Sequence, residues 1–305
     1  MAEELLRQPT WPDISPGRWA ATVQMESPAG CRVALLGLAD DTGVGMNNGR
    51  LGAQDGPASI RSALARYGTT FHLTTGQELS SVQVFDAGDI VAGNSLDETH
   101  DAITERVAWI LAEGMTPVCL GGGHDLTWPA IRAVMNQFSG AAGVYYDAHL
   151  DVREEEGSGM PFRRILEKTS CRSLHVVGLD PFANSREHIE WFVANGGVIE
   201  TASVFETPEF DRIPTTAAAE CFVSFDLDVV ACSEAPGVSA INPVGLSASD
   251  ADQIAYQCGR NDAVRYFDVM ELNPRFDIDG RTSRLAARMI LSFIAGFAGR
   301  ESRHV

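Results

Sequence analysis

Positive charge is scarce in this chain. Its 305 residues include 23 Lys and Arg against 41 Asp and Glu, which gives a formal net charge of −18. Proteins that bind nucleic acids gather Lys and Arg against the phosphates, and no such cluster occurs here. The composition therefore argues against nucleic acid as a partner. Part of the acidity would be offset if several aspartates held divalent cations.

Long apolar runs and paired cysteine motifs are also missing. No apolar run reaches the roughly 18 residues needed to span a bilayer, so no membrane segment is expected. The N-terminus, Met-Ala-Glu-Glu-Leu-Leu, has neither a basic region nor a long apolar stretch, which argues against a signal peptide. The six cysteines form no CxxC pair and no regular framework. We therefore expect reduced thiols and a cytoplasmic location.

Short apolar runs and amphipathic stretches alternate along the chain. The apolar runs predict strands at 32–37, 82–86, 117–120, 143–146, 174–178, 197–200, 221–225 and 264–270. The amphipathic stretches predict helices at 57–66, 97–113, 128–137, 184–194, 248–258 and 282–297. Strands that alternate with helices indicate a single three-layer α/β/α domain with a parallel sheet of roughly eight strands.

The N-terminal 30 residues differ from the rest of the chain. They contain Pro9, Pro12, Pro16 and Pro28 and are expected to form an arm rather than a domain. Residues 31–305 contain no linker, internal repeat or low-complexity segment. The sequence therefore predicts an arm at 1–30 followed by one domain at 31–305.

Side chains that bind hard metal ions follow four of the predicted strands. They lie in Gly-Gly-Gly-His at 121–124, Asp-Ala-His-Leu-Asp at 147–151, Asp-Leu-Asp at 226–228, and at Glu271. In open parallel sheets, ligands gather beyond the carboxyl ends of the strands. Alternate residues of an extended segment point to one face, so the acidic and imidazole side chains of each motif should converge. The sequence thus predicts a metal site at one edge of the sheet.

The ligand count indicates two ions. The candidate ligands, two imidazoles and four carboxylates, are His124, Asp147, His149, Asp151, Asp226 and Asp228. So many acidic groups cannot pack together without cations, and one zinc ion uses only about four ligands. An oxygen-rich set with two imidazoles favours manganese, although nickel, cobalt or iron would also suit it. Two neighbouring ions would lower the pKa of a bridging water and supply hydroxide near neutral pH.

Each motif also has a simpler interpretation when taken alone. Asp-x-His-x-Asp can be a solvated turn, Gly-Gly-Gly-His a tight strand-to-helix turn, and Asp226 and Asp228 can be helix caps or loop acids. A phosphate loop at Gly121–Gly123 would need a following Lys-Ser/Thr, which is absent. The coincidence of four strand ends favours the metal site. The other histidines, at 72, 100, 175, 188 and 304, belong to no such cluster and are expected to be structural or surface residues.

At these residues the chain resembles the ureohydrolase superfamily of arginases, agmatinases and formimidoylglutamases, from about Gly37 to the C-terminus. The resemblance implies a parallel eight-stranded sheet between helices, two manganese ions per subunit and a homo-oligomer, either a trimer or a hexamer. It implies one ion held by His124, Asp147, Asp151 and Asp226 and the other held by Asp147, His149, Asp226 and Asp228. Asp147 and Asp226 would then bridge the two ions.

Within this superfamily the chain is most similar to formimidoylglutamase. Arginases carry a His before the Gly-Met-Pro that follows the Asp-x-His-x-Asp loop, and Ser158 stands at that position here. The sequences that resemble formimidoylglutamase are Ser-Gly-Met-Pro-Phe-Arg at 158–163, Asp-Val-Arg at 151–153, and the segments 47–57, 178–185, 235–240 and 271–281. One departure is Asp180, where Gln is expected.

This resemblance implies hydrolysis of the amidine C–N bond of N-formimidoyl-L-glutamate to L-glutamate and formamide. Arg153, Arg163 and Arg50 are the candidate anchors for the two carboxylates of the small-molecule substrate, because guanidinium pairs bidentately with carboxylate. Each of these arginines could instead form a surface ion pair. Ser158 is a further candidate for substrate binding.

The catalytic residues implied by the resemblance are Glu271 and Asp151. Glu271 would pair with the substrate amidinium, and Asp151 would carry a proton to the departing amine. The main alternative is a ureohydrolase that releases urea from a guanidino compound such as agmatine, guanidinobutyrate, guanidine or arginine. A single-zinc deacetylase would leave Asp151 and Asp228 unexplained, and a non-catalytic metal-binding protein would be expected to lack a bridging Asp or Glu271.

Overall fold

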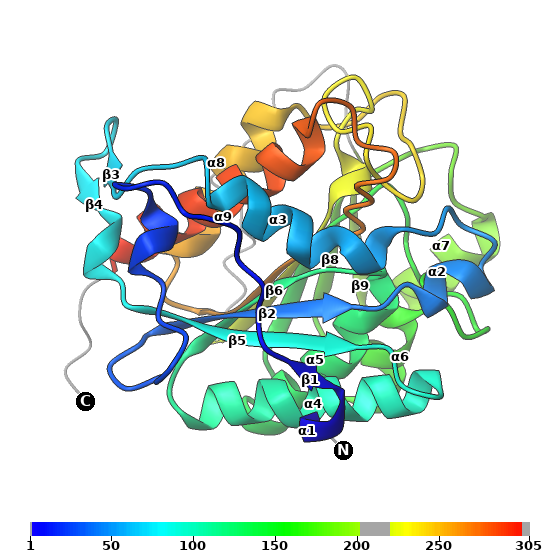
Figure 1. Ribbon diagram of the computed structural model, residues 1–305. Helices are drawn as coiled ribbons and strands as arrows, with labels where there is room; N and C mark the ends of the chain where they lie inside the picture. Colours follow the sequence, from blue (N-terminus) through cyan, green and yellow to red (C-terminus); the bar gives the residue numbers. More distant parts are fainter. Residues whose placement is uncertain (1, 202–219, 301–305) are drawn as a thin grey trace.

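A single large sheet forms the centre of the molecule in the computed structural model, which describes residues 2–201 and 220–300 (Figure 1). The strand order is β1-β5-β2-β6-β11-β10-β7-β8-β9. In sequence order the strands are β1 (Leu6–Arg7), β2 (Val33–Ala39), β5 (Val84–Val91), β6 (Thr116–Leu120), β7 (Ala142–Tyr146), β8 (Leu174–Leu179), β9 (Gly197–Thr201), β10 (Cys221–Asp226) and β11 (Val264–Met270). All neighbours pair in parallel except β1, which is antiparallel to β5. The predicted parallel sheet of about eight strands is confirmed, and each predicted strand is present.

Helices and short turns connect the strands. The α-helices are α1 (Ala2–Leu5), α2 (Thr42–Met46), α3 (Gly56–Leu64), α4 (Leu96–Ala112), α5 (Thr127–Gln137), α6 (Pro161–Lys168), α7 (Arg186–Ala194), α8 (Ala248–Arg260) and α9 (Arg281–Ala298). The 3₁₀ helices are η1 (Trp19–Thr22), η2 (Ala53–Asp55), η3 (Leu79–Ser81), η4 (His124–Leu126) and η5 (Leu227–Val229). A separate hairpin consists of β3 (Phe71–His72) and β4 (Gln77–Glu78). The six predicted helices are therefore all present, together with α1, α2 and α6.

Helices cover both faces of the sheet (Figure 1). Helices α3, α8 and α9 pack on one face, and α4, α5, α6 and α7 pack on the other. Successive residues of a strand point to opposite faces of the sheet. In β6, Val118 and Leu120 pack in the core beneath α3, α8 and α9, and Cys119 packs in the core on the other face. Burial on both faces explains why the strands are continuously apolar rather than alternating. The result is the expected three-layer α/β/α architecture.

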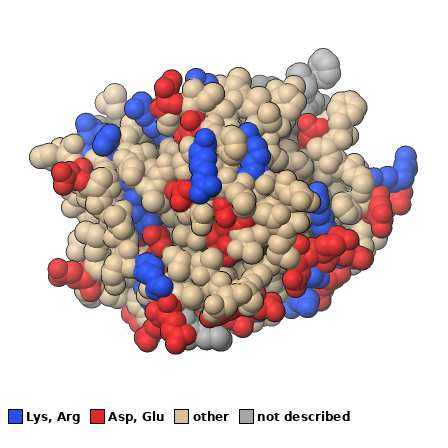
Figure 2. Space-filling view, turned by 45° about the vertical axis from the view of Figure 1, so that its right-hand side comes forward, with Lys and Arg blue, Asp and Glu red and all other residues tan. Residues whose placement is uncertain are grey.

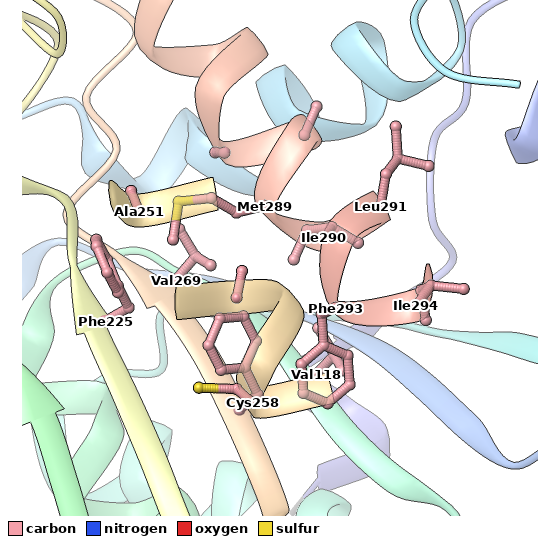
Figure 3. Close-up of a cluster of buried hydrophobic side chains, with 14 of the residues drawn as sticks. Val118, Phe225, Ala251, Cys258, Val269, Met289, Ile290, Leu291, Phe293 and Ile294 are labelled. Atoms are coloured by element: carbon pink, nitrogen blue, oxygen red, sulfur yellow. The ribbon is translucent and has the colours of Figure 1, made fainter. Parts of the chain in front are cut away.

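The core beneath α8 and α9 anchors the C-terminal part of the chain (Figure 3). Phe293 of α9 stacks on Phe267 of β11, with ring centroids 4.8 Å apart and an interplanar angle of 13°. Phe293, Phe267 and Val269 are fully buried. Burial of an aromatic or aliphatic side chain of this size contributes about 1.5–3 kcal/mol. This packing fixes β11, and with it the loop that begins at Glu271.

The N-terminal segment lies against the domain. Strand β1 extends the sheet at β5, and Trp19 is fully buried in the core shared with α9. The division into an arm at 1–30 and a domain at 31–305 stays a prediction. Residue 1 and residues 301–305, including His304, are outside the described ranges. Within the described ranges, no helix is both long and apolar enough to cross a membrane.

Candidate metal centre and active site

The four predicted segments meet because their strands are neighbours. Strands β6, β11, β10 and β7 lie side by side in the middle of the sheet and run parallel. His124 follows β6, Glu271 follows β11, Asp226 ends β10 and Asp147 follows β7. All four side chains therefore emerge at the same carboxyl edge, and Asp147, Asp226 and Glu271 are at most 4% exposed.

One group of ligand-type atoms surrounds His124. Its Nδ1 lies 3.2 Å from Asp147 Oδ2, 3.0 Å from Asp151 Oδ2 and 3.0 Å from Asp226 Oδ2. A single ring nitrogen carries at most one proton, so it can donate to only one of these oxygens. The other two carboxylate oxygens then face the same ring nitrogen without receiving a hydrogen bond from it. A divalent cation among these atoms would satisfy all of them.

A second group contains His149. Its Nδ1 lies 3.4 Å from Asp147 Oδ1 and 3.1 Å from Asp228 Oδ2. Asp147 therefore presents one oxygen to each group, which is the geometry of a bridging carboxylate. Asp226 is arranged in a similar way: its Oδ2 faces His124, and its Oδ1 accepts the Asp228 backbone N–H at 2.8 Å, as Asp147 Oδ1 accepts the His149 backbone N–H at 2.6 Å. A bridging role for Asp226 stays a prediction. The two groups are thus His124, Asp147, Asp151 and Asp226, and Asp147, His149 and Asp228.

Hydrogen bonds at Nε2, on the side of the ring away from the carboxylates, fix the orientation of His124. Its Nε2 lies 3.0 Å from Ser224 Oγ, and that hydroxyl donates to Asp268 Oδ1 at 2.7 Å. Asp268 also accepts hydrogen bonds from Thr127 and Tyr266, both at 2.8 Å. Because Ser224 donates to Asp268, it accepts from His124 Nε2–H. Nδ1 is therefore the nitrogen that faces the carboxylates, as a metal ligand requires.

The titration behaviour reflects crowded charges. Burial opposes protonation of His124, but Asp226 and the other carboxylates raise its pKa well above the ordinary value. Asp228 and Asp147 likewise raise the pKa of His149. Burial, together with Asp151 and Asp228, raises the pKa of Asp147 to about 6. A cation bound among these groups would act in the opposite direction, because it favours neutral imidazoles and charged carboxylates.

Glycines allow the strand ends to approach closely. A Cβ at Gly121 would lie 2.7 Å from Met270 Cα, and one at Gly122 would lie 2.1 Å from Asp40 O. The Gly-Gly-Gly run thus packs against neighbouring strand ends and places His124 at the site. Asp151 and Glu271 have φ values of 48° and 65°, in the left-handed region that non-glycine residues rarely adopt. Such strain is concentrated at functional sites.

Glu271 lies beside the first group. Its Oε1 accepts the backbone N–H of His124 at 2.7 Å, and its Oε2 is buried without a hydrogen-bond partner among the described residues. Burial raises the pKa of Glu271 to about 8. A cationic group that entered the site would find an unpaired acceptor at Oε2 and would favour the charged carboxylate.

A cavity of about 450 Å³ opens over both groups. Arg153 and Ser158, two of the predicted substrate-binding residues, line it together with Glu271, Asp151 and Asp228. Arg153 is exposed, and its guanidinium has no hydrogen bond or ion pair with any described residue. Ser158 Oγ lies 3.2 Å from the Asn47 side-chain amide. The cavity therefore has acidic groups on one side and an available cation on another.

Two predicted substrate-binding arginines do not line this cavity. Arg163 pairs with Glu154 at 2.5 Å and with Glu167 at 3.0 Å, and it lies over the Trp191 ring. Arg50 donates to the carbonyl oxygens of Val238 and Ser239 and lies over the Phe276 ring. Both guanidinium groups are occupied within the protein. Arg50 contacts the cavity lining through its hydrogen bond to the carbonyl oxygen of Ser239.

Several cavity residues have no role predicted from the sequence, although four of them lie in the segments 47–57, 178–185 and 235–240 that carry the family resemblance. Asn184, Ser185 and His188 reach the cavity from the start of α7, and Asn47 and Ser239 reach it from two loops. The sequence predicts that His188 is a structural or surface residue because it belongs to no ligand cluster. In the structure it lines the cavity. Asp180 is not part of the lining, and its Oδ1 accepts the Phe182 N–H at 2.7 Å. In the sequence, the α7 residues are marked by Asn, Ser and His that occur together around a predicted helix start.

The residues present fit a pair of divalent cations. Buried oxygens of Asp147, Asp228 and Glu271 lack hydrogen-bond partners among the described residues. The donor set combines carboxylate oxygen with imidazole nitrogen, which suits manganese and related ions. Across the surrounding face, acidic side chains are more extensive than basic ones, and the basic side chains form no broad patch (Figure 2). The site can therefore hold cations and admit a small polar molecule.

Known proteins resemble this chain both in sequence and in structure. The model of the arginase family matches residues 31–296. A formimidoylglutamase of Ralstonia nicotianae is 30% identical over 319 residues, covering 94% of this chain and 93% of that protein. A formimidoylglutamase of Klebsiella pneumoniae is 34% identical over 273 residues, covering 84% and 83%. The crystal structure of Trypanosoma cruzi formiminoglutamase with Mn²⁺ has a TM-score of 0.82 and 31% identity, covering 90% of this chain and 96% of that one.

Proposed function

Because this chain belongs to the arginase family, we propose that it hydrolyses N-formimidoyl-L-glutamate to L-glutamate and formamide. The observation that carries this proposal is Asp147, whose two oxygens face the His124 and His149 groups beside the cavity that Arg153, Asp151 and Asp228 line. The formimidoylglutamase relatives support the choice of substrate.

The cofactor in this proposal is a pair of manganese ions. His124, Asp147, Asp151 and Asp226 would hold one ion, and Asp147, His149, Asp226 and Asp228 would hold the other. The unpaired buried oxygens and the Mn²⁺ of the T. cruzi relative support this assignment. When bound, such ions lower the pKa of water and so supply the nucleophile for hydrolysis near neutral pH.

The protein's own residues orient the substrate and move protons. Glu271 Oε2, buried and without a partner among the described residues, accepts from the amidinium N–H and positions the amidine carbon over the two groups. Water adds its oxygen to that carbon, and the bond from carbon to the glutamate nitrogen breaks. Asp151 accepts a proton from that water and transfers it to the nitrogen, which leaves as an amine. The remaining atoms depart as formamide.

Arg153 provides the charge that a dicarboxylate requires. It is the predicted anchor that lines the cavity, and its guanidinium is free to form a bidentate pair with a substrate carboxylate. Ser158 contributes a hydroxyl to the same cavity. Arg50 and Arg163 support the loops around the cavity through the contacts described above.

We also propose a cytoplasmic location and a homo-oligomer, either a trimer or a hexamer. All six cysteines are free thiols, which supports a reducing compartment. The oligomer is proposed from the resemblance to the arginase family. Light scattering of the purified protein measures the assembly directly.

The test is an activity screen of the manganese-loaded protein. N-formimidoyl-L-glutamate, L-arginine, agmatine and 4-guanidinobutyrate are assayed in parallel, with formamide, urea and glutamate as readouts. We expect equal amounts of formamide and glutamate from the first substrate and no urea from the others. Urea from a guanidino substrate would overturn the substrate assignment. An Asp147→Asn variant controls for contaminating activity, because it alters the bridging carboxylate and leaves the cavity walls intact.

A further inference from the structure

A second cavity lies away from the metal centre. It has a volume of about 320 Å³ and shares no lining residue with the first cavity. Its walls come from the N-terminal segment, the turn after α3, the β3–β4 hairpin and α9. Figure 1 places β3 and β4 at the end of the molecule opposite α2 and α7, which border the first cavity. A ligand here would not occupy the active site.

The chemistry of the second cavity is that of an anion site with apolar walls. Arg18 has no ion pair or hydrogen bond to its guanidinium from the described residues, and its Nε is buried without a partner. An unpaired cation in a partly buried position is costly, and a bound anion would remove that cost. Arg18 therefore offers a positive charge to this cavity that no described acidic residue pairs with.

The other arginine of this cavity is already neutralised. Arg288 donates to Asp252 at 2.8 Å and to the Tyr67 hydroxyl at 3.1 Å. It therefore fixes the Tyr67 ring at the cavity and adds little net charge. The cavity thus offers one uncompensated positive charge, which fits a monoanion better than a phosphate dianion.

Aromatic and apolar side chains form much of the remaining wall, beside the polar Thr69 and Ser292. Tyr67 and Phe71 are 36% and 45% exposed, and Leu291 forms part of the wall. The His72 ring is held by Thr75 Oγ1 at 2.6 Å and stacks on Tyr256. Gly68, with φ of 93°, brings the Tyr67 turn against α9, since a Cβ there would lie 2.3 Å from Leu291 Cδ1. Aromatic walls favour a planar ring over an aliphatic chain.

We propose that this second cavity binds a small planar aromatic carboxylate, with the carboxylate on Arg18 and the ring between Tyr67 and Phe71. The proposal is independent of the substrate hydrolysed at the metal centre. The Arg18 guanidinium pairs with the carboxylate, and burial of the ring adds the selectivity against small aliphatic anions.

Calorimetric titration of the full-length, manganese-loaded protein with benzoate tests this. Acetate supplies the charge without the ring, and benzyl alcohol supplies the ring without the charge. We expect benzoate to bind at least tenfold more tightly than either, and Arg18→Gln to weaken benzoate binding at least tenfold. Arg66→Gln is the matched control, since Arg66 is exposed, lies next to Tyr67 and does not line the cavity.

Other outcomes would overturn the proposal. Benzoate binding that is lost in Arg153→Gln but kept in Arg18→Gln would place the ligand at the metal centre. Equal binding of acetate and benzoate would remove the role of the aromatic walls. Absence of benzoate binding, with a second copy of the chain covering the cavity in solution, would show a subunit interface instead. If Arg18→Gln does not fold, Phe71→Ala must weaken benzoate binding and leave acetate binding unchanged.

Discussion

The Nε2 of His124 lies 3.0 Å from the Oγ of Ser224, and this contact decides which ring nitrogen faces the carboxylates. Ser224 donates its own proton to Asp268, so it can only accept from the imidazole. The Nδ1 of His124 is thereby directed at the oxygens of Asp147, Asp151 and Asp226. A buried serine within a strand thus controls the geometry of the first ligand group.

Replacement of Ser224 by Ala should weaken metal binding without unfolding the protein. The loss of this orienting hydrogen bond is expected to lower Mn²⁺ affinity about 10–100-fold. Titration against a competing chelator measures the affinity. Ser59→Ala is the control, because it also removes one internal hydrogen bond, from α3 to Ser283, without touching either ligand group. Equal affinities in both variants would argue against an orienting role for Ser224.

Asp147 and Asp151 should differ in how many ions they control. Asp147 faces both ligand groups, whereas Asp151 belongs to one. We therefore expect Asp147→Asn to lose both ions and Asp151→Asn to lose chiefly the ion at His124. Elemental analysis after extensive dialysis measures the content. Two ions retained in Asp147→Asn would contradict the bridging position of this carboxylate.

Arg153 and Arg163 provide a matched pair within one segment. Arg153→Gln should raise KM about tenfold or more, because a charge-assisted hydrogen bond worth about 1.5–3 kcal/mol is lost. Arg163→Gln should leave KM nearly unchanged and lower Tm, since Arg163 contacts Glu154, Glu167 and Trp191. Steady-state kinetics and thermal melts distinguish the two. A large KM effect from Arg163→Gln alone would reverse the assignment.

Metal-free protein should become less stable as pH rises from about 5 to 8. Burial raises the pKa of Asp147 to about 6 and that of Glu271 to about 8. A carboxyl group with a higher pKa in the folded chain favours folding below its unfolded pKa, and that contribution is lost as pH rises through the folded pKa. The raised pKa values of His124 and His149 act in the same direction.

The corresponding measurement is a set of melts with and without manganese. Without metal, Tm should fall by more than about 4 °C between pH 5 and 8. Added Mn²⁺ should raise Tm more at pH 8, because ions displace protons from the ligands. A metal-free Tm that increases over this interval would contradict the expected sign.

The strands and the ligands could be predicted from the sequence better than the walls of the cavity. The strands are recognisable because both faces are buried, which leaves uninterrupted apolar runs. His124 and Asp147 are recognisable because they closely follow such runs. The adjacency of β6, β11, β10 and β7 depends on long-range pairing that no local pattern encodes. Helix α6 is not evident from the sequence because its eight residues are short for a periodicity signal.

Other residues escape prediction for different physical reasons. Asp268 lies inside the apolar run of β11, and a carboxylate in a fully buried strand is itself a signal of a polar network. The roles of Arg153 and Arg163 depend on the direction in which each side chain leaves its backbone and on the acidic partners within reach. Neither property follows from residue type, so the predicted arginine anchors divide into one that lines the cavity and two that do not.

The two edge strands of the sheet, β1 and β9, differ in length. At one end, Leu6 and Arg7 pair antiparallel with Ile90 and Asp89, so the outermost strand is only two residues long. At the other end, no strand among residues 2–201 and 220–300 pairs with the outer side of β9, which has five residues. Exposed strand edges are where chains add to one another, and very short edge strands discourage such addition. Edge-to-edge association through β9 would therefore stop at a closed pair, because neither copy offers a second long edge from which a fibril could grow.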